Sequence, residues 1–369
     1  MKVVSVVGAR PQFIKAFPVS AALRLSHTEV LVHTGQHYDH ELSEVFFQEL
    51  DIPEPGYNLG VGSDTHGRQT AAIMAEIEPV LEAESPDAVI VYGDTNSTVA
   101  AALVAAKTDA IVAHVESGLR SGNRSMPEEL NRILTDHASD VLFAPTDTAV
   151  DNLSAEGLGD RTIQSGDVMV DSLEWTREQL DGRATERPGP GVVDTDEYLL
   201  LTVHREANTT DKTRLQGIID AVGQQEQTVI FPIHPRTKAA LRRYGLYEQA
   251  LETMHVIPPV SYFDSIALID QASVLVTDSG GMQKEAFLLD TPCVTLRDET
   301  EWDETVEAGW NVLVGADPDR IRAVLATHQW PSSDHKPQPY GDGTAAQRIV
   351  SSLEDIISLE TPSLPTSLQ

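Results

Sequence analysis

The sequence predicts an α/β protein made of two Rossmann-like, parallel-sheet domains that face a central cleft. Strand-like apolar runs alternate with helix-length segments from one end of the chain to the other. The length of 369 residues, 41% of them hydrophobic, is sufficient for two domains. Each half opens with an apolar run that ends in a cation, Arg10 in the first half and Arg205 in the second. Open α/β sheets bind ligands at the carboxyl ends of their strands, so two such edges would line one cleft.

Apolar runs of strand length mark the expected strands. In the first half these are Lys2–Val7, Glu29–His33, Ala88–Tyr92, Ala110–His114 and Val141–Phe143. The amphipathic helices between them include Pro11–Leu25, Glu41–Leu50, Thr65–Glu82 and Pro127–His137. In the second half the expected strands are Tyr198–Val203, Val229–Ile233, His255–Ile257, Val274–Thr277, Cys293–Leu296 and Val312–Val314.

A polar segment rich in Pro and Gly, residues 182–191, is the expected linker between the halves. We expect a first domain over residues 1–168 and a second over 169–344. A last helix, about 345–358, is expected to pack back on the first domain, and residues 359–369 form a tail.

The chain is strongly acidic, with a formal net charge of −31 from 57 Asp and Glu against 26 Lys and Arg. This charge argues against binding of nucleic acid or of an anionic membrane. The acidic residues are spread along the whole chain, which suits a cell interior at very high salt, where the Debye length falls to about 3 Å at 1 M. A halophilic, haloarchaeal host is therefore our hypothesis. A phosphate ligand would need local cations to overcome this field.

Several classes of protein are disfavoured by what the sequence lacks. The single cysteine, Cys293, excludes a disulfide framework, and its apolar surroundings indicate a buried thiol. No apolar stretch is long enough to span a bilayer, and the N-terminus does not resemble a signal peptide, so we expect a cytoplasmic protein. Gly-x-Gly-x-x-Gly, the P-loop and His-Glu-x-x-His are all missing, so we expect no nicotinamide cofactor and no metal.

The segment 274–285 carries the clearest ligand-binding pattern. An apolar strand is followed by Ser279, by Gly280 and Gly281 as a tight turn, and by a helix expected over Met282–Leu289. A helix N-terminus suits a phosphate, which the two glycines would let approach the backbone. Glu285, about one helical turn further on, is placed to accept hydrogen bonds from ribose hydroxyls. The alternative is an ordinary strand-to-helix turn.

Cations and carboxylates follow the strands of the first half. Arg10 and Lys15 bracket the start of the first expected helix, where they are either surface cations or a clamp for a diphosphate. Asp94 and Glu116 each end an expected strand, and Glu128 begins a helix shortly afterwards. Three carboxylates converging on one cleft suit general acid–base chemistry.

Two of these carboxylates, Glu128 and Asp94, also have purely structural interpretations. Ser125 and Glu128 have the spacing of a capping box, and Glu128 and Arg132 have the spacing of a helical ion pair. Asp94 is equally suited to cap the helix that follows it. In the second half, His204 and His234 each follow a strand, where each is either a proton donor to a departing phosphate or a packing histidine.

Taken together, these residues resemble the non-hydrolysing UDP-N-acetylglucosamine 2-epimerase family. The matching motifs cover nearly the whole chain: Gly8-Ala9-Arg10-Pro11, Gly93-Asp94-Thr95, His114-Val115-Glu116, Pro127-Glu128-Glu129, Asn131-Arg132, His204-Arg205, Thr277-Asp278-Ser279-Gly280-Gly281 and Glu285. The resemblance implies a glycosyltransferase-B-type architecture, a homodimer and a UDP-sugar as substrate.

The resemblance also implies roles for single residues. Ser279, Gly280 and Gly281 would hold the diphosphate and Glu285 the ribose. The phosphate site would be completed by Arg10, Lys15 and His204. The groups facing the sugar would be Asp94, Glu116 and Glu128, with Arg132 supporting Glu128.

Some bacterial members bind a second, activating substrate molecule beside the active site. The residues that match this allosteric site are Gln36, His37, Arg68 and His234, although Asp39 stands where glutamine is usual. Two further departures concern the substrate. Gln12 replaces a common glutamate, and Trp302 replaces an arginine that contacts the nucleotide in many members. Both variants are similar to a branch that acts on UDP-2,3-diacetamido-2,3-dideoxyglucuronate.

The expected reaction is inversion of C2 of UDP-N-acetylglucosamine through a 2-acetamidoglucal, since no nicotinamide is expected to oxidise the sugar. Three alternatives stay open: the diacetamido-uronate epimerase, hydrolytic release of N-acetylmannosamine, and a glycosyltransferase of the same fold. A nucleotide-sugar sensor without catalysis is a fourth.

Overall fold

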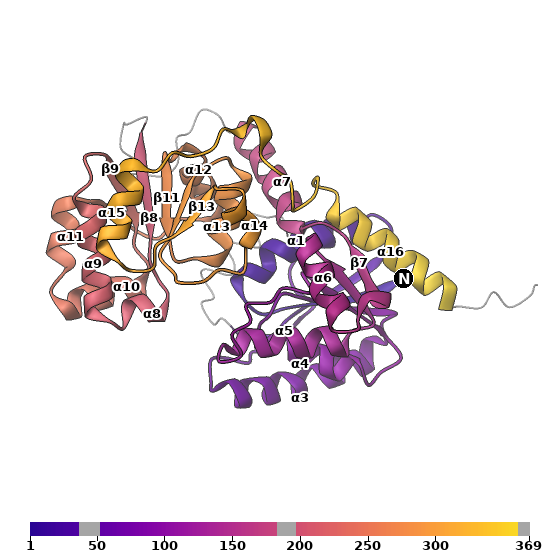
Figure 1. Ribbon diagram of the computed structural model, residues 1–369. Helices are drawn as coiled ribbons and strands as arrows, with labels where there is room; N and C mark the ends of the chain where they lie inside the picture. The colour runs from indigo at the N-terminus through magenta and orange to yellow at the C-terminus, as the bar shows by residue number, and fades with distance from the viewer. Residues whose placement is uncertain (37–51, 183–196, 361–369) are drawn as a thin grey trace, which may run out of the picture. The chain divides into compact units, whose positions relative to one another are not determined.

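The computed structural model describes residues 1–36, 52–182 and 197–360, and the chain divides into two compact units (Figure 1). Unit 1 consists of residues 1–175 and the segment from 338 onward, and unit 2 consists of residues 176–337. The boundary lies inside helix α7 (Val168–Gly182), whereas the sequence suggested residue 168.

Unit 1 is built on a parallel sheet. In the described residues its strand order is β3-β2-β1-β4-β5-β6-β7. The bounds are β1 Lys2–Val7, β2 Thr28–His33, β3 Tyr57–Asn58, β4 Ala88–Tyr92, β5 Ile111–Val115, β6 Val141–Ala144 and β7 Thr162–Gln164. The central strands β4 and β5 are buried on both faces, which explains their unbroken apolar runs.

Helices cover both faces of this sheet. On one face α3 (His66–Glu84), α4 (Asn96–Ala105) and α5 (Pro127–Ala138) lie side by side, and on the other α16 (Ala345–Glu360) packs against α1 (Arg10–Arg24) (Figure 1). The remaining helices of unit 1 are α6 (Asp147–Ala155), the 3₁₀ turn Gly159–Arg161 and the first part of α7. A fully buried cluster that includes Val4, Val91 and Ile77 joins the sheet to α3 and α4.

Unit 2 repeats the same design with six parallel strands in the order β10-β9-β8-β11-β12-β13. The strands are β8 Tyr198–Thr202, β9 Thr228–Pro232, β10 His255–Ile257, β11 Val274–Thr277, β12 Cys293–Thr295 and β13 Asn311–Leu313. The helices are α8 Glu206–Thr209, α9 Lys212–Gly223, α10 Pro235–Tyr244, α11 Tyr247–Thr253, α12 Tyr262–Gln271, α13 Gly280–Leu288, α14 Asp303–Glu307 and α15 Pro318–Thr327. The 3₁₀ turn Ser333–His335 follows.

The strand order creates a switch point in each sheet. β1 lies beside β4 in unit 1, and β8 lies beside β11 in unit 2. In each sheet, the strands that follow the first member of the pair extend to one side, and the strands that follow the second member extend to the other side. Ligands of doubly wound sheets bind outside the carboxyl ends of such strand pairs. The loops after β1, β4, β8 and β11 are therefore the places to look for a site.

Three local expectations are wrong. Helix α13 begins at Gly280, not at Met282, because neither glycine takes the left-handed conformation of a tight turn and both form its first turn. The edge strands β3 and β7 were not expected, because their partly exposed residues include polar side chains and form no apolar run. The N-cap of α5 is Met126, not Ser125. The helix expected over Glu41–Leu50 lies outside the described residues.

No helix in the described part of the chain is long and apolar enough to cross a membrane.

Candidate active site

Glu116 follows strand β5 at the carboxyl edge of the unit 1 sheet. Its backbone has a φ of 69°, in the left-handed region that costs a residue with a side chain about 1–2 kcal/mol. Its carboxylate is buried and forms an ion pair with Lys15, which reaches over from α1. Strained backbone of this kind is concentrated at functional sites.

Gly93, at the end of the neighbouring strand β4, makes room for this ion pair. A Cβ atom on Gly93 would lie 3.4 Å from Lys15 Nζ and 3.5 Å from Glu116 Oε2. Gly93 also has a φ of 64°, which glycine adopts without strain. The turn after β4 therefore brings the backbone next to the Lys15–Glu116 pair.

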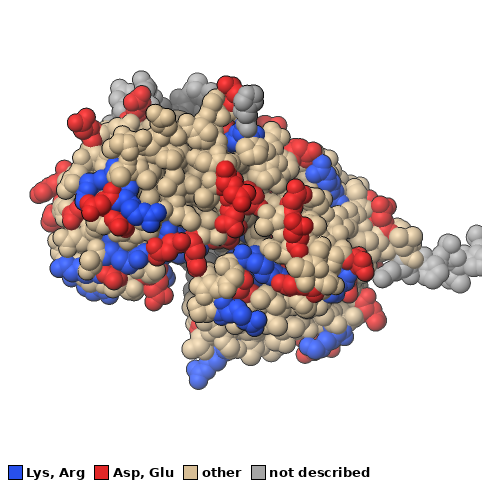
Figure 2. All heavy atoms as spheres, in the orientation of Figure 1, with Lys and Arg blue, Asp and Glu red and all other residues tan. Residues whose placement is uncertain are grey.

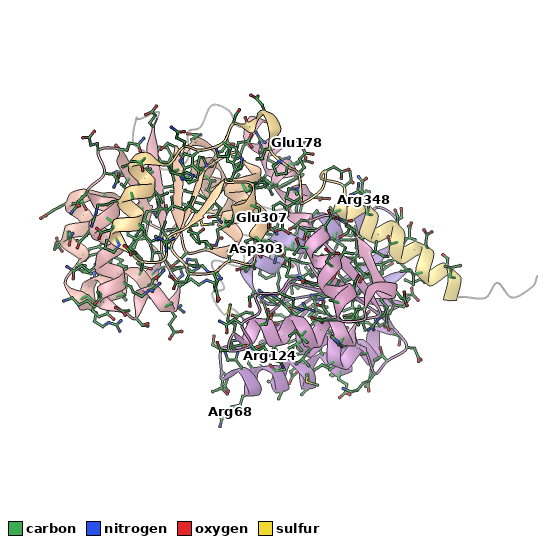
Figure 3. The ribbon with its side chains drawn as sticks, viewed as in Figure 1. Arg68, Arg124, Glu178, Asp303, Glu307 and Arg348 are labelled. Atoms are coloured by element: carbon green, nitrogen blue, oxygen red, sulfur yellow. The ribbon has the colours of Figure 1, made fainter. Side chains whose placement is uncertain are left out.

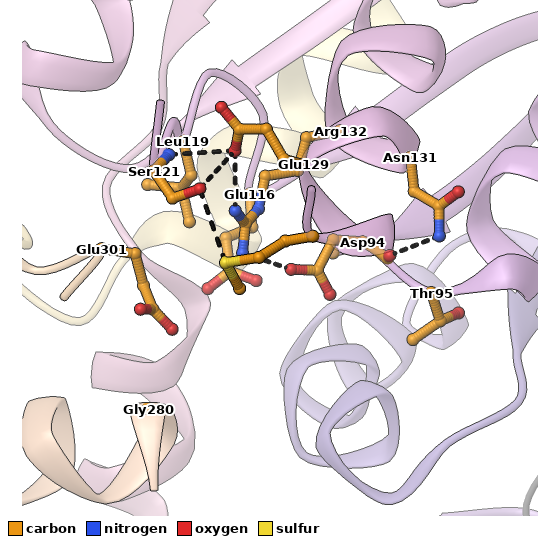
Figure 4. A network of polar contacts seen from close by, with 12 residues as sticks. Asp94, Thr95, Glu116, Leu119, Ser121, Glu129, Asn131, Arg132, Gly280 and Glu301 are labelled. Carbon is orange, nitrogen blue, oxygen red and sulfur yellow. Dashed lines mark hydrogen bonds and ion pairs between the residues drawn. The ribbon is translucent and has the colours of Figure 1, made fainter. Parts of the chain in front are cut away.

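Asp94 follows directly and is held by Arg132 from α5, whose Nη2 lies 2.6 Å from Asp94 Oδ2 (Figure 4). Asn131 Nδ2 donates to the Asp94 carbonyl at 3.0 Å. Asp94 does not cap the next helix, because Thr95 is the N-cap of α4 and accepts from the Thr98 amide. With Glu116, the structure thus places two carboxylates on adjacent strand ends, each beside its own cation.

The carboxylate that organises the start of α5 is Glu129, which the sequence interpretation overlooked. It accepts hydrogen bonds from Ser121 N at 2.9 Å and from Arg132 Nη1 at 3.0 Å (Figure 4). It also accepts from Gly122 N at 3.0 Å. Burial raises the pKa of Glu129, but the hydrogen bonds from Ser121, Arg132 and Gly122 outweigh it and lower the pKa overall. Its position next to Glu128 in the quoted motif was the only available signal.

Glu128 itself is half-buried at the first turn of α5. The capping box that the sequence offered as a structural alternative is not formed, since Met126 is the N-cap of α5 and the Ser125 hydroxyl donates to Asn123 Oδ1 at 2.7 Å. Arg132 forms ion pairs with Asp94 and Glu129.

Gln12 connects the loops after β1 and β4. Its Oε1 accepts from Gly8 N at 2.8 Å and Ala9 N at 3.0 Å, while its Nε2 donates to the Tyr92 carbonyl at 2.7 Å. Glutamine suits this buried position because the contact with the Tyr92 carbonyl needs a donor. Arg10 is the first residue of α1, and its side chain lies outside the described structure.

In unit 2, His204 follows β8 and is held by Asp278, which follows the adjacent strand β11. His204 Nδ1 lies 3.2 Å from the buried Asp278 carboxylate, which also accepts from the amides of His204 and Arg205 and from Asn208. A carboxylate beside Nδ1 favours the tautomer that carries its proton on Nδ1. The Nε2 atom of His204 is then available to contact another group. Asp278 stood in the quoted motif, and an acidic residue directly after a buried strand was the signal that could have identified it.

The N-terminus of α13 forms the second part of the unit 2 edge. Ser279 is the N-cap, but its hydroxyl makes no capping hydrogen bond, and Gly280 and Gly281 are the first helical residues. A Cβ on Gly280 would lie 2.5 Å from Glu301 Oε1, so a larger residue there would require the Glu301 carboxylate to shift. The Trp302 indole Nε1 donates to the Gly280 carbonyl at 3.0 Å, and Glu285 is buried further along the helix.

Two of the residues matched to an allosteric site, Gln36 and His234, form hydrogen bonds within their own units. Gln36 Oε1 accepts from Ser97 N at 3.2 Å and from Ser97 Oγ at 2.6 Å. His234 is the N-cap of α10 and its Nδ1 accepts from Arg236 N at 3.1 Å, while its ring lies 5.6 Å from that of His204. Arg68 is exposed on α3 (Figure 3), and His37 lies outside the described residues.

Among the described residues, no group of three or more His, Cys, Asp or Glu side chains is arranged to hold a metal ion.

Two doubly wound units, each with charged side chains at its switch point, define a two-domain α/β enzyme of the Rossmann type. The sequence matches the family described as UDP-N-acetylglucosamine 2-epimerase over residues 22–354, and the chain belongs to this family. The predicted fold class, two parallel-sheet α/β domains, and the predicted enzyme class, an isomerase, are both confirmed.

Individual relatives cover almost the whole chain. A "UDP-N-acetylglucosamine 2-epimerase homolog" from Methanococcus maripaludis is 46% identical and covers 96% of this chain and 100% of its own. The UDP-2,3-diacetamido-2,3-dideoxy-D-glucuronate 2-epimerase of Pseudomonas aeruginosa is also 46% identical, over 95% of this chain and 98% of its own. The crystal structure of Methanocaldococcus jannaschii UDP-GlcNAc 2-epimerase in complex with UDP-GlcNAc and UDP matches with a TM-score of 0.85, 41% identity, and coverage of 96% of this chain and 100% of that one.

Proposed function

We propose that this protein inverts C2 of UDP-N-acetylglucosamine to give UDP-N-acetylmannosamine. The family to which the chain belongs supports this reaction, and a relative of 41% identity has been crystallised with UDP-GlcNAc and UDP. The observation that carries the proposal is the pair of neighbouring carboxylates, Glu116 beside Lys15 and Asp94 beside Arg132, at the switch-point edge of unit 1.

The chemistry requires elimination before proton transfer. The hydrogen on C2 is not adjacent to a carbonyl, so its direct removal would leave a poorly stabilised carbanion. Cleavage of the C1–O bond, with its electron pair leaving on UDP, makes C1 cationic and the C2 proton acidic. A base then takes this proton and a C1=C2 double bond forms. Protonation of C2 on the opposite face and return of the UDP oxygen to C1 give the epimer.

Two carboxylates in different surroundings suit the two proton transfers. We assign these roles to Glu116 and Asp94, with Glu128 as the next candidate. Glu116 is buried against Lys15, whereas the Asp94 side chain beside Arg132 is 30% exposed.

Unit 2 is proposed to bind the UDP part. The N-terminus of α13 offers backbone amides and a partial positive charge to the diphosphate, with Ser279, Gly280 and Gly281 in its first turn. Glu285 would accept the ribose hydroxyls, and His204, oriented by Asp278, would face the leaving phosphate. Lys15 and Arg10 are the remaining cations of the proposed phosphate site.

Proton NMR of UDP-N-acetylglucosamine incubated with the protein in heavy water and concentrated KCl tests the proposal. We expect deuterium at C2 together with UDP-N-acetylmannosamine signals, in the absence of any acceptor. No exchange and no product with folded protein contradict the proposal for this substrate. Irreversible accumulation of UDP and free sugar would instead indicate the hydrolytic reaction, and turnover that depends on an acceptor would indicate a glycosyltransferase.

The second candidate substrate is UDP-2,3-diacetamido-2,3-dideoxyglucuronate. It is favoured by the 46% identical Pseudomonas aeruginosa enzyme of that name and by Trp302, which is buried against Gly280. The same deuterium experiment with this sugar nucleotide decides between the two. We expect the higher kcat/KM with UDP-N-acetylglucosamine, and a preference of about tenfold or more for the uronate would reverse the assignment.

We also propose that the active form is a homodimer. Light scattering after size-exclusion chromatography in molar KCl tests this directly. A mass near the 40.1 kDa of one chain under conditions where the enzyme turns over would contradict it.

A further inference from the structure

His114, in strand β5, is a completely buried ring two residues before Glu116. Both of its ring nitrogens have close partners. Nδ1 lies 2.6 Å from Asp136 Oδ1 on α5, and Nε2 lies 2.7 Å from the Gly93 carbonyl oxygen at the end of β4. A carbonyl can only accept a hydrogen bond, so Nε2 must carry a proton.

The second ring nitrogen also faces an acceptor. Asp136 Oδ2 accepts from Gly118 N at 3.2 Å and is paired with Arg120 Nη2 at 2.8 Å. Burial raises the pKa of Asp136, but the hydrogen bonds and charges of His114 and Arg120 lower it overall. Asp136 thus connects the His114 ring to the Gly118 amide.

Arg120 holds the second oxygen of Asp136 from the other side. It also forms a two-pronged contact with the exposed Glu156, at 2.7 and 2.9 Å. Asp136 is therefore fixed between His114, Arg120 and the Gly118 amide.

The network reaches both turns that carry the proposed acid–base groups. Through Nε2 it holds the carbonyl of Gly93, the residue directly before Asp94. Asp136 contacts His114, two residues before Glu116, and accepts from the amide of Gly118, two residues after it. Glu116 therefore takes its left-handed conformation between two positions that are bonded to the same carboxylate.

We propose that His114 is a positioning residue, which holds the Gly93 carbonyl and so sets the turn after β4 such that Asp94 and Glu116 face the substrate correctly. This role rests on the proposed epimerase function. The sequence motif His114-Val115-Glu116 contains the histidine, but its partner Asp136 lies 22 residues away.

Two amide substitutions separate the two hydrogen bonds of His114. The amide nitrogen of Gln reaches the place of Nε2, so His114→Gln can still donate to Gly93. The amide nitrogen of Asn reaches the place of Nδ1, so His114→Asn can still donate to Asp136. Both variants lose one donor and a similar part of the ring, and they act as matched controls for one another.

We expect His114→Asn to lower kcat by about 10–100-fold with KM and UDP affinity within about threefold of wild type, because small displacements of reacting groups are that costly. We expect His114→Gln to keep kcat within about threefold. Melting temperatures of both variants are measured alongside. Equal kcat values in the two variants, or a larger loss in His114→Gln, would overturn the positioning role through Gly93.

The C2-exchange assay of the wild-type protein separates the two proposals. Lack of exchange by the wild-type protein would contradict the epimerase function. Exchange by the wild-type protein together with equal kcat values in the two variants would overturn only the positioning role.

Discussion

Glu116 shows how single residues at this site are held. Its carboxylate is buried and paired with Lys15, and its φ of 69° is strained. Such a conformation persists only because the neighbouring contacts over-determine it. Two further residues shape the turn after β4. Gly93 leaves room for the ion pair, and the buried Gln12 amide donates to the Tyr92 carbonyl at the end of the strand.

Glu116→Gln tests the proposed acid–base role. The substitution keeps the shape of the side chain but removes its ability to take up a proton, so we expect turnover to fall at least about 100-fold. UDP affinity, measured by calorimetry, should change little because the variant keeps every group that is assigned to bind UDP, including Lys15. Deuterium exchange at C2 near the wild-type rate would remove Glu116 from this role.

Gly93→Ala tests whether the Lys15–Glu116 ion pair requires a residue without a side chain at position 93. The new methyl group would lie 3.4 Å from Lys15 Nζ and 3.5 Å from Glu116 Oε2. The matched control is Gly157→Ala, which has a similar φ of 77° but nothing within 4 Å of the new methyl group. Both should lose about 1–2 kcal/mol of stability from the left-handed backbone. Only Gly93→Ala should also lower kcat, and equal kcat in both variants would contradict the argument.

At the scale of elements, helix α5 links the acid–base edge to its supports. Its first turn carries Glu129, its second turn carries Arg132, and further along it carries Asp136. These three side chains hold the loop after β5 and the Asp94 carboxylate. One amphipathic helix thus orients groups from two neighbouring strand ends.

Glu129→Gln is predicted to change the acid limb of the stability profile. The folded pKa of Glu129 is lowered, so its stabilisation is fully present above the unfolded pKa of about 4.3 and is lost as pH falls through the folded pKa. The variant should lose about 1–3 kcal/mol at pH 7 and respond less to acidification. Glu128→Gln, one residue earlier, should show little of either change. Chemical denaturation between pH 3 and 7 measures both, and parallel pH profiles for wild type and Glu129→Gln would refute the assignment.

The second element-scale prediction concerns α13. Ser279→Ala removes a hydroxyl that does not cap the helix, so its stability cost should be small. If the N-terminus binds the diphosphate, UDP affinity should fall about 3–30-fold, and by at least as much for Glu285→Ala. Thr327→Ala, on the exposed end of α15, serves as the control. Unchanged calorimetric affinity in Ser279→Ala and Glu285→Ala would refute the proposed UDP site.

At the scale of the whole molecule, charge is the dominant property. The net charge of −31 makes the folded chain repel itself, and acidic side chains are scattered over the face seen in Figure 2. We expect the melting temperature to rise steadily with KCl into the molar range as screening shortens the reach of this repulsion. Sucrose at equal osmolality separates screening from general osmolyte effects. A melting temperature indifferent to KCl would contradict the halophilic hypothesis.

The parallel α/β class and most strand and helix positions could be predicted from the sequence by itself. Val274–Thr277 and Ala88–Tyr92, for example, read directly as buried strands because burial on both faces demands an unbroken apolar run. The motifs were also sufficient to indicate the family. The roles of single site residues remain proposals, and their positions on strand ends follow from the same local patterns.

Only the tertiary structure decided which strand ends meet and which side chains pair. Strand order placed β1 beside β4 and β8 beside β11, so that Gln12 reaches the Tyr92 carbonyl and Asp278 reaches His204. It also showed that Arg132 pairs with Asp94, 38 residues earlier in the chain. Local sequence specifies backbone propensity and apolar periodicity, but a hydrogen bond between distant segments depends on distances that exist only after the chain has folded.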